Sequence, residues 1–479
     1  MEYKKLISPF NYINGALVSA EETIPVYDKY SGELLAQVSM ANESQVETAL
    51  QSVSNSFKIF KNFSAEKRAG ILQQLHRLLL EQKELFAQLI AAEAGKPIHY
   101  AQSEVQRALQ NIEDGIRQTF LFTGQQVPMD YYNGKNKTAY TIRIPAGPVL
   151  GITPFNFPLN LALHKLIPAL AVGAPIILKP APQAPLTLLA LAKLLQQTDL
   201  PKGSVNILLT NNELTKKMLE DSRLRIFSFT GSDRVGWMLK NKAFKKKVFL
   251  ELGGNAASII DASADLKRAA KKLAYGSFLY AGQICISSQR IYVDKTVFDD
   301  FLQLFLKETG AIKSGNPFDP EVVNSSMISA NDMHRIDHWI KEAVNDGATI
   351  LSGGQILDEK ANVYAPTILT GTNARMKVWQ NEAFAPVVLV EKAADFKTAV
   401  RMANNSRYGL QTAVFTNDFA HVLYAQKEIE AGAVIVNDIP GFRIDSMPYG
   451  GIKDSGIGRE GAYYAMHDYT EPKLMVLGT

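Results

Sequence analysis

Apolar residues recur with a helical period over the first quarter of the chain. Between residues 44 and 118 they fall at positions i, i+3, i+4 and i+7, as in EKRAGILQQLHRLLLEQKELFAQLIAAEAGKP, which ends in Gly-Lys-Pro. This spacing predicts a series of amphipathic helices. The period changes in residues 125–145, where alternating segments lie near the pair Asn133 and Gly134. The alternation predicts an exposed β-hairpin.

From residue 147 onward, a buried strand, a turn rich in glycine or proline and a helix follow one another several times. The segment GPVLGITPFNFPLNLALHKLIPALAVG begins this series, and a second series runs from about residue 256 to 433. Strands that alternate with helices form parallel sheets that are covered on both faces. We therefore expect an α/β fold. The apolar segment EPKLMVL near the end is expected to form a strand that pairs with the hairpin or with another subunit.

Composition and charge narrow the function classes. Apolar residues make up 46% of the 479 residues and charged residues 20%, which is typical of a globular protein. The net charge is only +4, the basic segment 240–249 is explained by a solvated face, and no basic stripe interleaved with aromatic residues indicates nucleic acid. The first residues contain no apolar signal segment, and the apolar stretch 186–195 is too short to span a bilayer. A cytoplasmic protein without a membrane or nucleic-acid partner is expected.

Two of the turns at strand ends carry nitrogen groups suited to ligand binding, since ligands of open α/β sheets lie at the carboxyl ends of the strands. In PFNFP, residues 154–158, two prolines restrict the backbone around Asn156, whose amide could stabilise an oxyanion. An Asn that caps the next helix is the alternative. In LKPA, Lys179 ends an apolar strand. It could bind a ribose or phosphate, or be a solvated turn residue.

Two further strand ends carry groups that could bind an anion or act as a general base. The sequence FTGS, residues 229–232, leads from a strand into a helix whose free N–H groups could accept a pyrophosphate, although the G-x-G-x-x-G fingerprint is absent. In LELGG, Glu251 lies in an apolar strand before two glycines. Burial would raise the pKa of this carboxyl toward that of a general base. A structural glutamate paired with a lysine is the alternative.

Cys285, in LYAGQICISSQR, is the only cysteine of the chain. A single cysteine excludes an internal disulfide and cysteine-based metal clusters, and it fits a reducing compartment. Alone it would be interpreted as a small buried hydrophobe. A nucleophilic cysteine needs an oxyanion donor and a base, which Asn156 and Glu251 could supply. His334 and His338 have i, i+4 spacing without supporting carboxylates, so no metal site is expected.

The chain resembles the NAD(P)-dependent aldehyde dehydrogenase superfamily through eight motifs in the order of that family: PFNFP, LKPA, LPKGSVN, FTGS, LELGG, GQICISSQR, NEAFAPVV and MPYGGIKDSGIGREG. The resemblance implies two doubly wound parallel-sheet domains and a small β bridging element. The coenzyme domain would comprise residues 1–124 and 146–253, the catalytic domain 254–464, and the oligomerisation element 125–145 and 465–479. A homodimer or homotetramer is implied.

The resemblance also assigns roles. Cys285 would be the nucleophile and Glu251 the general base. The amide of Asn156 and the backbone N–H of Cys285 would form the oxyanion hole, and Lys165 would tune proton transfers. The cofactor, NAD or NADP, would contact Thr153, Pro154, Phe155, Lys179, Pro182, Phe229, Gly231, Ser232, Leu252, Glu382 and Phe384. The reaction implied is oxidation of an aldehyde to a carboxylic acid through a thiohemiacetal and a thioester on the cysteine.

The sequence departs from the family pattern at positions that bear on the cofactor. Pro182 stands where NAD-preferring relatives carry a glutamate that grips the adenosine ribose, so a 2′-phosphate would meet no charge repulsion and use of NADP is expected. The segment LLTNNELTKKML lacks the usual glycines, and Asn211 and Asn212 are expected to tolerate left-handed turns in their place. Ala385 replaces a usual glycine, a change we expect to be tolerated.

Residues for the substrate are less distinctive. The resemblance places the loop with Arg443 and Asp445 near the substrate tunnel of the family and the helix with Arg107 on its other wall. Arg107 and Arg443 could bind a carboxylate, phosphate or hydroxyl, or could be structural ion-pair residues. Phe157 and Ile284 would line the same tunnel. Ile284 argues against glyceraldehyde 3-phosphate, because relatives specific for it carry a basic residue there. A short polar aliphatic aldehyde, similar to lactaldehyde or a semialdehyde, is favoured. The alternatives are a CoA-acylating dehydrogenase, a thioester or ester hydrolase that uses the same cysteine, and a non-catalytic family member.

Overall fold

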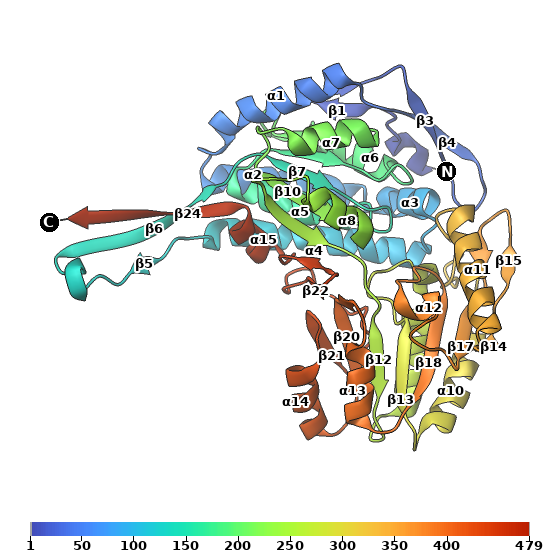
Figure 1. Ribbon diagram of the computed structural model, residues 1–479. Helices are drawn as coiled ribbons and strands as arrows, with labels where there is room; N and C mark the ends of the chain where they lie inside the picture. Colours follow the sequence, from blue (N-terminus) through green and yellow to red (C-terminus); the bar gives the residue numbers. More distant parts are fainter. Residues whose placement is uncertain (1, 479) are drawn as a thin grey trace.

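The larger sheet of the protein has parallel strands at its centre and antiparallel strands at its edges. In the computed structural model, which describes residues 2–478, its strands follow the order β2-β1-β9-β8-β7-β10-β11-β23 (Figure 1). β9, β8, β7, β10 and β11 run parallel. The strands are β1 (Asn11–Ile13), β2 (Ala16–Val18), β7 (Val149–Ile152), β8 (Ile176–Lys179), β9 (Val205–Ile207), β10 (Ile226–Thr230), β11 (Lys247–Glu251) and β23 (Gly456–Ile457).

Helices cover both faces of this sheet, which confirms the predicted α/β class. The predicted helical region, residues 44–118, forms α1 (Glu43–Phe60), α2 (Ala65–Glu81), α3 (Lys83–Ala94) and α4 (Ile98–Leu121). The helices between the strands are α5 (Asn160–Val172), α6 (Leu186–Leu195), α7 (Asn212–Glu220) and α8 (Asp233–Lys240). α3 ends at the predicted Gly-Lys-Pro stop, where Gly95 adopts the left-handed φ of 65° that glycine accepts without strain.

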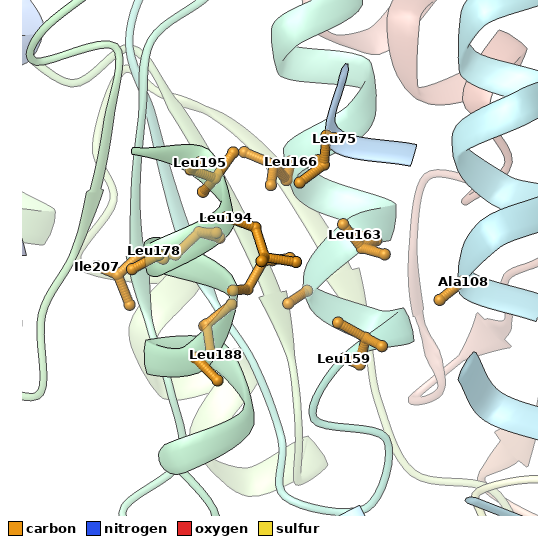
Figure 2. Close-up of a cluster of buried hydrophobic side chains, with 14 of the residues drawn as sticks. Leu75, Ala108, Leu159, Leu163, Leu166, Leu178, Leu188, Leu194, Leu195 and Ile207 are labelled. Atoms are coloured by element: carbon orange, nitrogen blue, oxygen red, sulfur yellow. The ribbon is translucent and has the colours of Figure 1, made fainter. Parts of the chain in front are cut away.

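The two apolar layers follow from the alternation of side chains along each strand. Ile176 and Leu178 of β8 point into the layer with α2 to α6, whereas Ile177 between them points into the layer with α1, α7 and α8. Figure 2 shows leucines of α5 and α6 gathered against β8 and β9 in the first layer. Because α5 is buried on all sides, both ends of this helix are fixed by packing.

Asn211 and Asn212 do not adopt the left-handed turns expected of them. Asn211 has a φ of −70° and caps α7, with its side chain accepting a hydrogen bond from the N–H of Leu214 at 2.9 Å. Asn212 is the first residue of that helix. The expectation was wrong because an asparagine before an amphipathic segment is equally suited to a helix N-cap.

A second sheet packs beside the first with the order β14-β17-β18-β13-β12-β20-β21 and carries its own helices (Figure 1). Its strands are β12 (Ala257–Ile260), β13 (Arg290–Asp294), β14 (Thr349–Ser352), β17 (Thr367–Thr370), β18 (Val387–Ala393), β20 (Gln411–Phe415) and β21 (Ala433–Val436). Its helices are α9 (Leu266–Phe278), α10 (Phe298–Gly310), α11 (Ala330–Asn345), α12 (Lys377–Gln380), α13 (Phe396–Asn404) and α14 (Phe419–Glu428). Within residues 2–478, no helix is long and apolar enough to cross a membrane.

The predicted hairpin and the segment EPKLMVL form one small sheet of the order β24-β6-β5, which projects from the body of the molecule (Figure 1). It consists of β5 (Gln126–Val127), β6 (Lys137–Pro145) and β24 (Thr470–Gly478), with the short helix η2 (Tyr132–Gly134) between β5 and β6. β24 pairs antiparallel with β6 along its whole length. Before it, α15 (Ala462–Asp468) packs against α5 and α4.

Among residues 2–478, the remaining elements are two short helices and three pairs of short strands. They are the helices η1 (Glu2–Leu6) and η3 (Leu279–Gly282), the pair β3 (Thr23–Tyr27) and β4 (Leu34–Ser39), the pair β15 (Ile356–Asp358) and β16 (Val363–Tyr364), and the pair β19 (Tyr408–Gly409) and β22 (Ile452–Lys453). β23 lies in the sequence range predicted for the catalytic domain but adds to the edge of the first sheet, antiparallel to β11. The chain therefore crosses back to the first sheet before α15.

A buried ion pair between Lys96 and Glu104 fixes the turn that precedes α5. Both side chains are fully buried, and the ammonium of Lys96 bonds one carboxylate oxygen of Glu104. The other oxygen accepts hydrogen bonds from the N–H groups of Leu159 and Asn160 at 3.0 and 3.1 Å. Glu104 thus supplies the cap at the start of α5, where no side chain of the local sequence does so.

Replacing Lys96 with methionine should lower the free energy of unfolding by about 3–5 kcal/mol, because it leaves a buried carboxylate without its cation. Lys4→Met is the matched control. Lys4 pairs with Glu33 at 2.6 Å, but both side chains are exposed, so its loss should leave the free energy of unfolding nearly unchanged. Urea unfolding followed by tryptophan fluorescence measures both values. Equal losses in the two variants would contradict the structural role of the buried pair.

Candidate active site

A cavity of about 1700 Å³ opens at the carboxyl ends of the central strands of the first sheet and is closed by loops of the second. This position is the one that open α/β sheets use for ligands. The predicted residues that line it are Arg107, Thr153, Pro154, Phe155, Asn156, Phe157, Lys179, Pro182, Phe229, Gly231, Ser232, Glu251, Leu252, Ile284, Cys285, Glu382, Phe384 and Arg443. Lys165 is not among the lining residues and lies fully buried behind them. Folding therefore brings nearly the whole predicted set to one cavity.

Cys285 lies on the loop after η3, and its Sγ is 3.0 Å from the hydroxyl of Tyr449. The loop is preceded by Tyr280 and Ala281, whose φ angles of 54° and 52° are unusual for residues with a side chain. Burial raises the pKa of the Cys285 thiol to about 12, and the hydrogen bond with Tyr449 works in the opposite direction. The thiol is thus a weak acid in this environment and depends on its neighbours for ionisation.

Asn156 is not a helix cap, the alternative that its position before α5 left open. Its Nδ2 donates a hydrogen bond to the backbone carbonyl of Gln283 at 2.9 Å, on the loop that carries Cys285. The amide nitrogen has a second N–H, which is directed by the same bond. The side chain is buried and lines the cavity, so it can offer this N–H to an oxygen beside the thiol.

Glu251 is the last residue of β11 and lacks the lysine partner of the structural alternative: within residues 2–478, no ion pair to Glu251 is formed, and Oε2 has no hydrogen-bond partner. Burial raises the pKa of this carboxyl well above its ordinary value, and the nearby carboxylate of Glu460 raises it further. A carboxyl group whose pKa is raised in this way takes up a proton more readily than an ordinary glutamate, as a general base must.

The two glycines that follow Leu252 let neighbouring groups approach the chain closely. A Cβ at Gly254 would lie 2.1 Å from the carbonyl oxygen of Cys285, and one at Gly253 would lie 2.6 Å from Oε2 of Glu382. Both distances are far below van der Waals contact, so larger residues would push the Cys285 loop and Glu382 away. The glycine pair therefore sets the spacing between β11, the thiol and the cofactor side of the cavity.

A buried charge cluster lies behind Glu251. The ammonium of Lys165 donates to the hydroxyls of Thr230 and Ser228 at 2.6 and 3.2 Å and lies 3.6 Å from Glu460. Burial alone would raise the pKa of Glu460, but neighbouring positive groups outweigh it and lower this pKa to about 2. The two neighbouring carboxyls therefore differ, because Glu460 keeps the negative charge while Glu251 resists it.

The half of the cavity nearest α7 and α8 fits a dinucleotide. Within the described residues Lys179 makes no ion pair, and its buried ammonium touches only the carbonyl of Pro180 at 3.5 Å; burial lowers its pKa to about 8. Ser232 precedes α8 but does not use its side chain as a cap. Glu382 accepts a hydrogen bond from the N–H of Gly254 at 3.0 Å, and Phe384 packs edge-on against Phe155.

At the opposite end, Arg107 and Arg443 both line the cavity and both lie against Asp445. Arg107 is held by two hydrogen bonds to this carboxylate, at 2.7 and 2.9 Å. Arg443 donates through one NH2 group to Glu460 at 2.9 Å, and its Nε has no hydrogen-bond partner although it is buried. His164 is buried beside them, with Nε2 2.8 Å from both Asp445 and Arg443.

Sequence reasoning missed two residues of the site, Tyr449 and Glu460. Both belong to the motif MPYGGIKDSGIGREG, in which the strand β23 returns the chain to the first sheet. An isolated backbone bridge between Tyr449 and Glu460 places them side by side. The signals in the sequence were a tyrosine before two glycines and a glutamate before one, which alone do not distinguish site residues. Within residues 2–478, no cluster of three or more histidine, cysteine or acidic side chains could hold a metal ion.

A two-sheet α/β protein whose single cysteine, buried amide and unpaired carboxylate share a dinucleotide-sized cavity has the arrangement of an oxidoreductase that works through a thiol. The family model of the aldehyde dehydrogenases matches residues 17–475. The chain belongs to the aldehyde dehydrogenase family, and it is an oxidoreductase that acts on aldehydes with NAD(P).

Among known proteins, the chain is 39% identical to 3-sulfolactaldehyde dehydrogenase of Priestia megaterium over 468 residues, 97% of each chain. It is 35% identical to lactaldehyde dehydrogenase of Methanococcus maripaludis, over 97% of this chain and 99% of the relative. Among solved structures, aldehyde dehydrogenase 21 of Physcomitrella patens, in complex with the reaction product succinate, has a TM-score of 0.95 and 36% identity over 98% of each chain. Glyceraldehyde-3-phosphate dehydrogenase GapN of Methanocaldococcus jannaschii, complexed with NADP, has a TM-score of 0.91 and 33% identity, over 96% of this chain and all of that one.

Proposed function

We propose that this enzyme oxidises a short aldehyde with an anionic group to the carboxylic acid, using NADP, through a thioester on Cys285. The observation that carries the proposal is the meeting of three groups at one cavity: a thiol, the amide of Asn156, and the carboxyl of Glu251 with an oxygen that has no partner. Each group serves one chemical need of thiol-based aldehyde oxidation.

In the first half of the reaction, the Cys285 thiolate attacks the aldehyde carbon. The carbonyl oxygen becomes an oxyanion, which the free N–H of Asn156 and the backbone N–H of Cys285 stabilise. The bond from Asn156 to the Gln283 carbonyl keeps the amide oriented without reorganisation at that moment. The cofactor, when bound, supplies the acceptor for the hydride that leaves the substrate carbon, after which the substrate is a thioester on Cys285.

In the second half, Glu251 takes a proton from the water that attacks the thioester carbon. The raised pKa of its carboxyl suits it to accept a proton, and Glu460 beside it remains ionised and repels a second negative charge. Lys165 counters the charge of Glu460, so it would tune this proton transfer without touching the substrate. The carboxylic acid leaves and the thiol is restored.

A short anionic substrate is supported by the short separation between the thiol and the guanidinium of Arg443. The guanidinium of Arg443 lies 3.7 Å from the ring centre of Tyr449, and the hydroxyl of that tyrosine bonds Sγ. A cation one tyrosine ring away from the nucleophile matches an aldehyde whose anionic group is a few carbons from the carbonyl. The Nε of Arg443 lies 3.7 Å from Oδ1 of Asp445 and makes no hydrogen bond, so it is a donor that an anionic group could still satisfy. The named substrate of the Priestia relative and the product bound to the Physcomitrella enzyme are both anions of this size.

The preference for NADP is supported by the charges at the far end of the cavity. Pro182 is exposed at its rim and brings no negative charge near Lys179. Positive side chains of α7, of α8 and of the turn after α8 line the same end: Lys216, Arg234 and Lys242. A 2′-phosphate would therefore lie among positive groups; the carboxylates in this part of the lining are Glu213 and Asp233, and Asp233 is paired with Arg407.

We also propose that the enzyme acts as a homo-oligomer in the cytoplasm. Apolar side chains are exposed along the projecting sheet: Tyr140, Ile142, Ile144, Leu474, Met475, Val476 and Leu477. By the strand register, Tyr140, Ile142, Ile144, Met475 and Leu477 share one face of this sheet, and Leu474 and Val476 lie on the other. Exposed apolar side chains gathered in this way are typical of a protein interface. The single cysteine fits a reducing compartment.

Cys285→Ser should abolish oxidation, and Glu251→Gln should slow the release of acid by about 10²–10⁴-fold while the first turnover stays fast. Stopped-flow absorbance of the reduced cofactor would then show a burst of one equivalent followed by a slow steady state. The reason is that only the second half of the reaction uses the base. Normal turnover in Cys285→Ser, or a slowed first turnover without a burst in Glu251→Gln, would contradict the assigned roles.

Wild-type kcat/KM should be at least as high with NADP as with NAD, and Pro182→Glu should lower the value for NADP by roughly tenfold or more, because its carboxylate would repel the 2′-phosphate. The value for NAD should rise or stay unchanged. Lys179→Met is the companion variant, which should weaken NADP more than NAD. A wild-type enzyme that strongly prefers NAD would refute the cofactor proposal without touching the chemistry at Cys285.

Arg443→Gln should lower kcat/KM for succinate semialdehyde about 10–100-fold more than for propanal, because only the former has a charge for the guanidinium to bind. Arg107→Gln is the matched control: its guanidinium is already held by two bonds to Asp445, so losses should be similar for both aldehydes. Steady-state assays with both substrates measure the ratio. An equal loss for the two aldehydes in Arg443→Gln would exclude Arg443 as the anion site.

A further inference from the structure

Tyr449 is the side chain whose hydroxyl forms a hydrogen bond with the sulfur of Cys285. Its hydroxyl lies 3.0 Å from Sγ, and the residue is 3% exposed. Within residues 2–478, that sulfur is the one hydrogen-bond partner recorded for this hydroxyl. A buried phenol with such a contact is oriented toward the nucleophile rather than toward solvent.

The ring of Tyr449 is held from two sides. Its backbone N–H donates to the carbonyl of Glu460 at 3.2 Å, and its carbonyl accepts from the N–H of Glu460 at 2.7 Å, which forms a bridge between the two residues. The guanidinium of Arg443 lies against the ring face at 3.7 Å from its centre. With the backbone tied and the face covered, the hydroxyl has little freedom to leave the sulfur.

We propose that Tyr449 is a catalytic residue whose hydroxyl donates a hydrogen bond to the thiolate of Cys285, stabilising the nucleophile until it attacks. The inference rests on the proposed role of Cys285. On ionisation, the thiol proton passes to water in the cavity while the phenol keeps its own proton. Once the sulfur is bonded to carbon it is a poor acceptor, so the bond is strong only before the attack.

The charges around the sulfur make such a donor necessary. The carboxylates of Glu382 and Glu251 face Cys285 and raise the pKa of its thiol, Arg443 lowers it, and burial is the largest influence. Burial also raises the pKa of Tyr449 well above its ordinary value, so the phenol stays protonated and can donate. Tyr100 is the other buried phenol that the charge of Cys285 influences.

Because Cys285 is the only cysteine, alkylation of the protein measures this thiol directly, without aldehyde or cofactor. The test compares wild type, Tyr449→Phe, Tyr100→Phe and Cys285→Ser with iodoacetamide and with the bulkier N-ethylmaleimide, from pH 6 to 10. Both reagents react with the thiolate: with iodoacetamide, an S–C bond forms as the C–I bond breaks and iodide leaves. Mass spectrometry counts the label, and Cys285→Ser is expected to take up none.

Tyr449→Phe should lower the thiolate fraction below the pKa of the thiol by about 10–100-fold, the loss expected when a hydrogen bond to a charged group is removed. The more basic thiolate is also more nucleophilic, so the net rate at neutral pH should fall by about three- to tenfold. The factor should be the same for both reagents, because it reflects ionisation and not access. Tyr100→Phe keeps a ring beside the thiol and removes no bond to Sγ, so its rates should lie within about twofold of wild type.

Wild-type rates in Tyr449→Phe would overturn the proposal, as would a slowing seen only with the bulky reagent, which would mark a steric role. In single turnovers with aldehyde, Tyr449→Phe should slow the burst and leave the release of acid unchanged. Should the wild-type enzyme alkylate as described but oxidise no aldehyde, the proposed function fails while the role of Tyr449 toward the thiol stands.

Discussion

The site depends on one buried ammonium, that of Lys96. Besides its ion pair with Glu104, this group lies 3.7 Å from the ring centre of Phe157 and 4.9 Å from that of Tyr280. Phe157 follows Asn156 in sequence, and Tyr280 begins the strained turn that leads to Cys285. A single cation thus contacts the turn of the oxyanion donor and the turn of the nucleophile. Since Glu104 also caps α5, the two turns cannot move apart without exposing a buried charge.

The difference in charge between two buried carboxyl groups also depends on where the buried cations lie. Glu251 and Glu460 are both buried, but Glu460 lies between Lys165 and Arg443, whereas Glu251 has no cation within ion-pair distance among the described residues. The positive groups stabilise the charge of Glu460, and that charge in turn disfavours ionisation of Glu251. A base of raised pKa therefore results from the placement of its neighbours and from burial, and its local sequence, an apolar strand before two glycines, contributes only the burial.

The sequence predicted the local part of this site well, because residues such as Lys179 and Glu251 end strands and the ends of parallel strands meet at one edge. It could not decide whether Asn156 caps a helix, since the actual cap, Glu104, comes from a different helix, and the choice depends on tertiary contacts. Tyr449 escaped prediction for a related reason. It lies 164 residues after Cys285 in the chain. It reaches the thiol only because the chain crosses back to the first sheet at β23. The order of the motifs indicated the family. Which side chains meet at the site depends on long-range strand pairing, which the motifs alone do not show.

The two chemical steps are also coupled through Arg443. Its guanidinium covers the ring that bonds the thiol and donates to the carboxylate that acts on the base, so one cation influences both the nucleophile and Glu251. A change at this position therefore alters attack and hydrolysis together, whatever the substrate. For that reason a loss of rate in an Arg443 variant says nothing by itself about substrate charge. The ratio of the rate losses for an anionic and a neutral aldehyde of similar length does report on substrate charge. The influence of Arg443 on Cys285 and Glu251 is common to both aldehydes and cancels in that ratio.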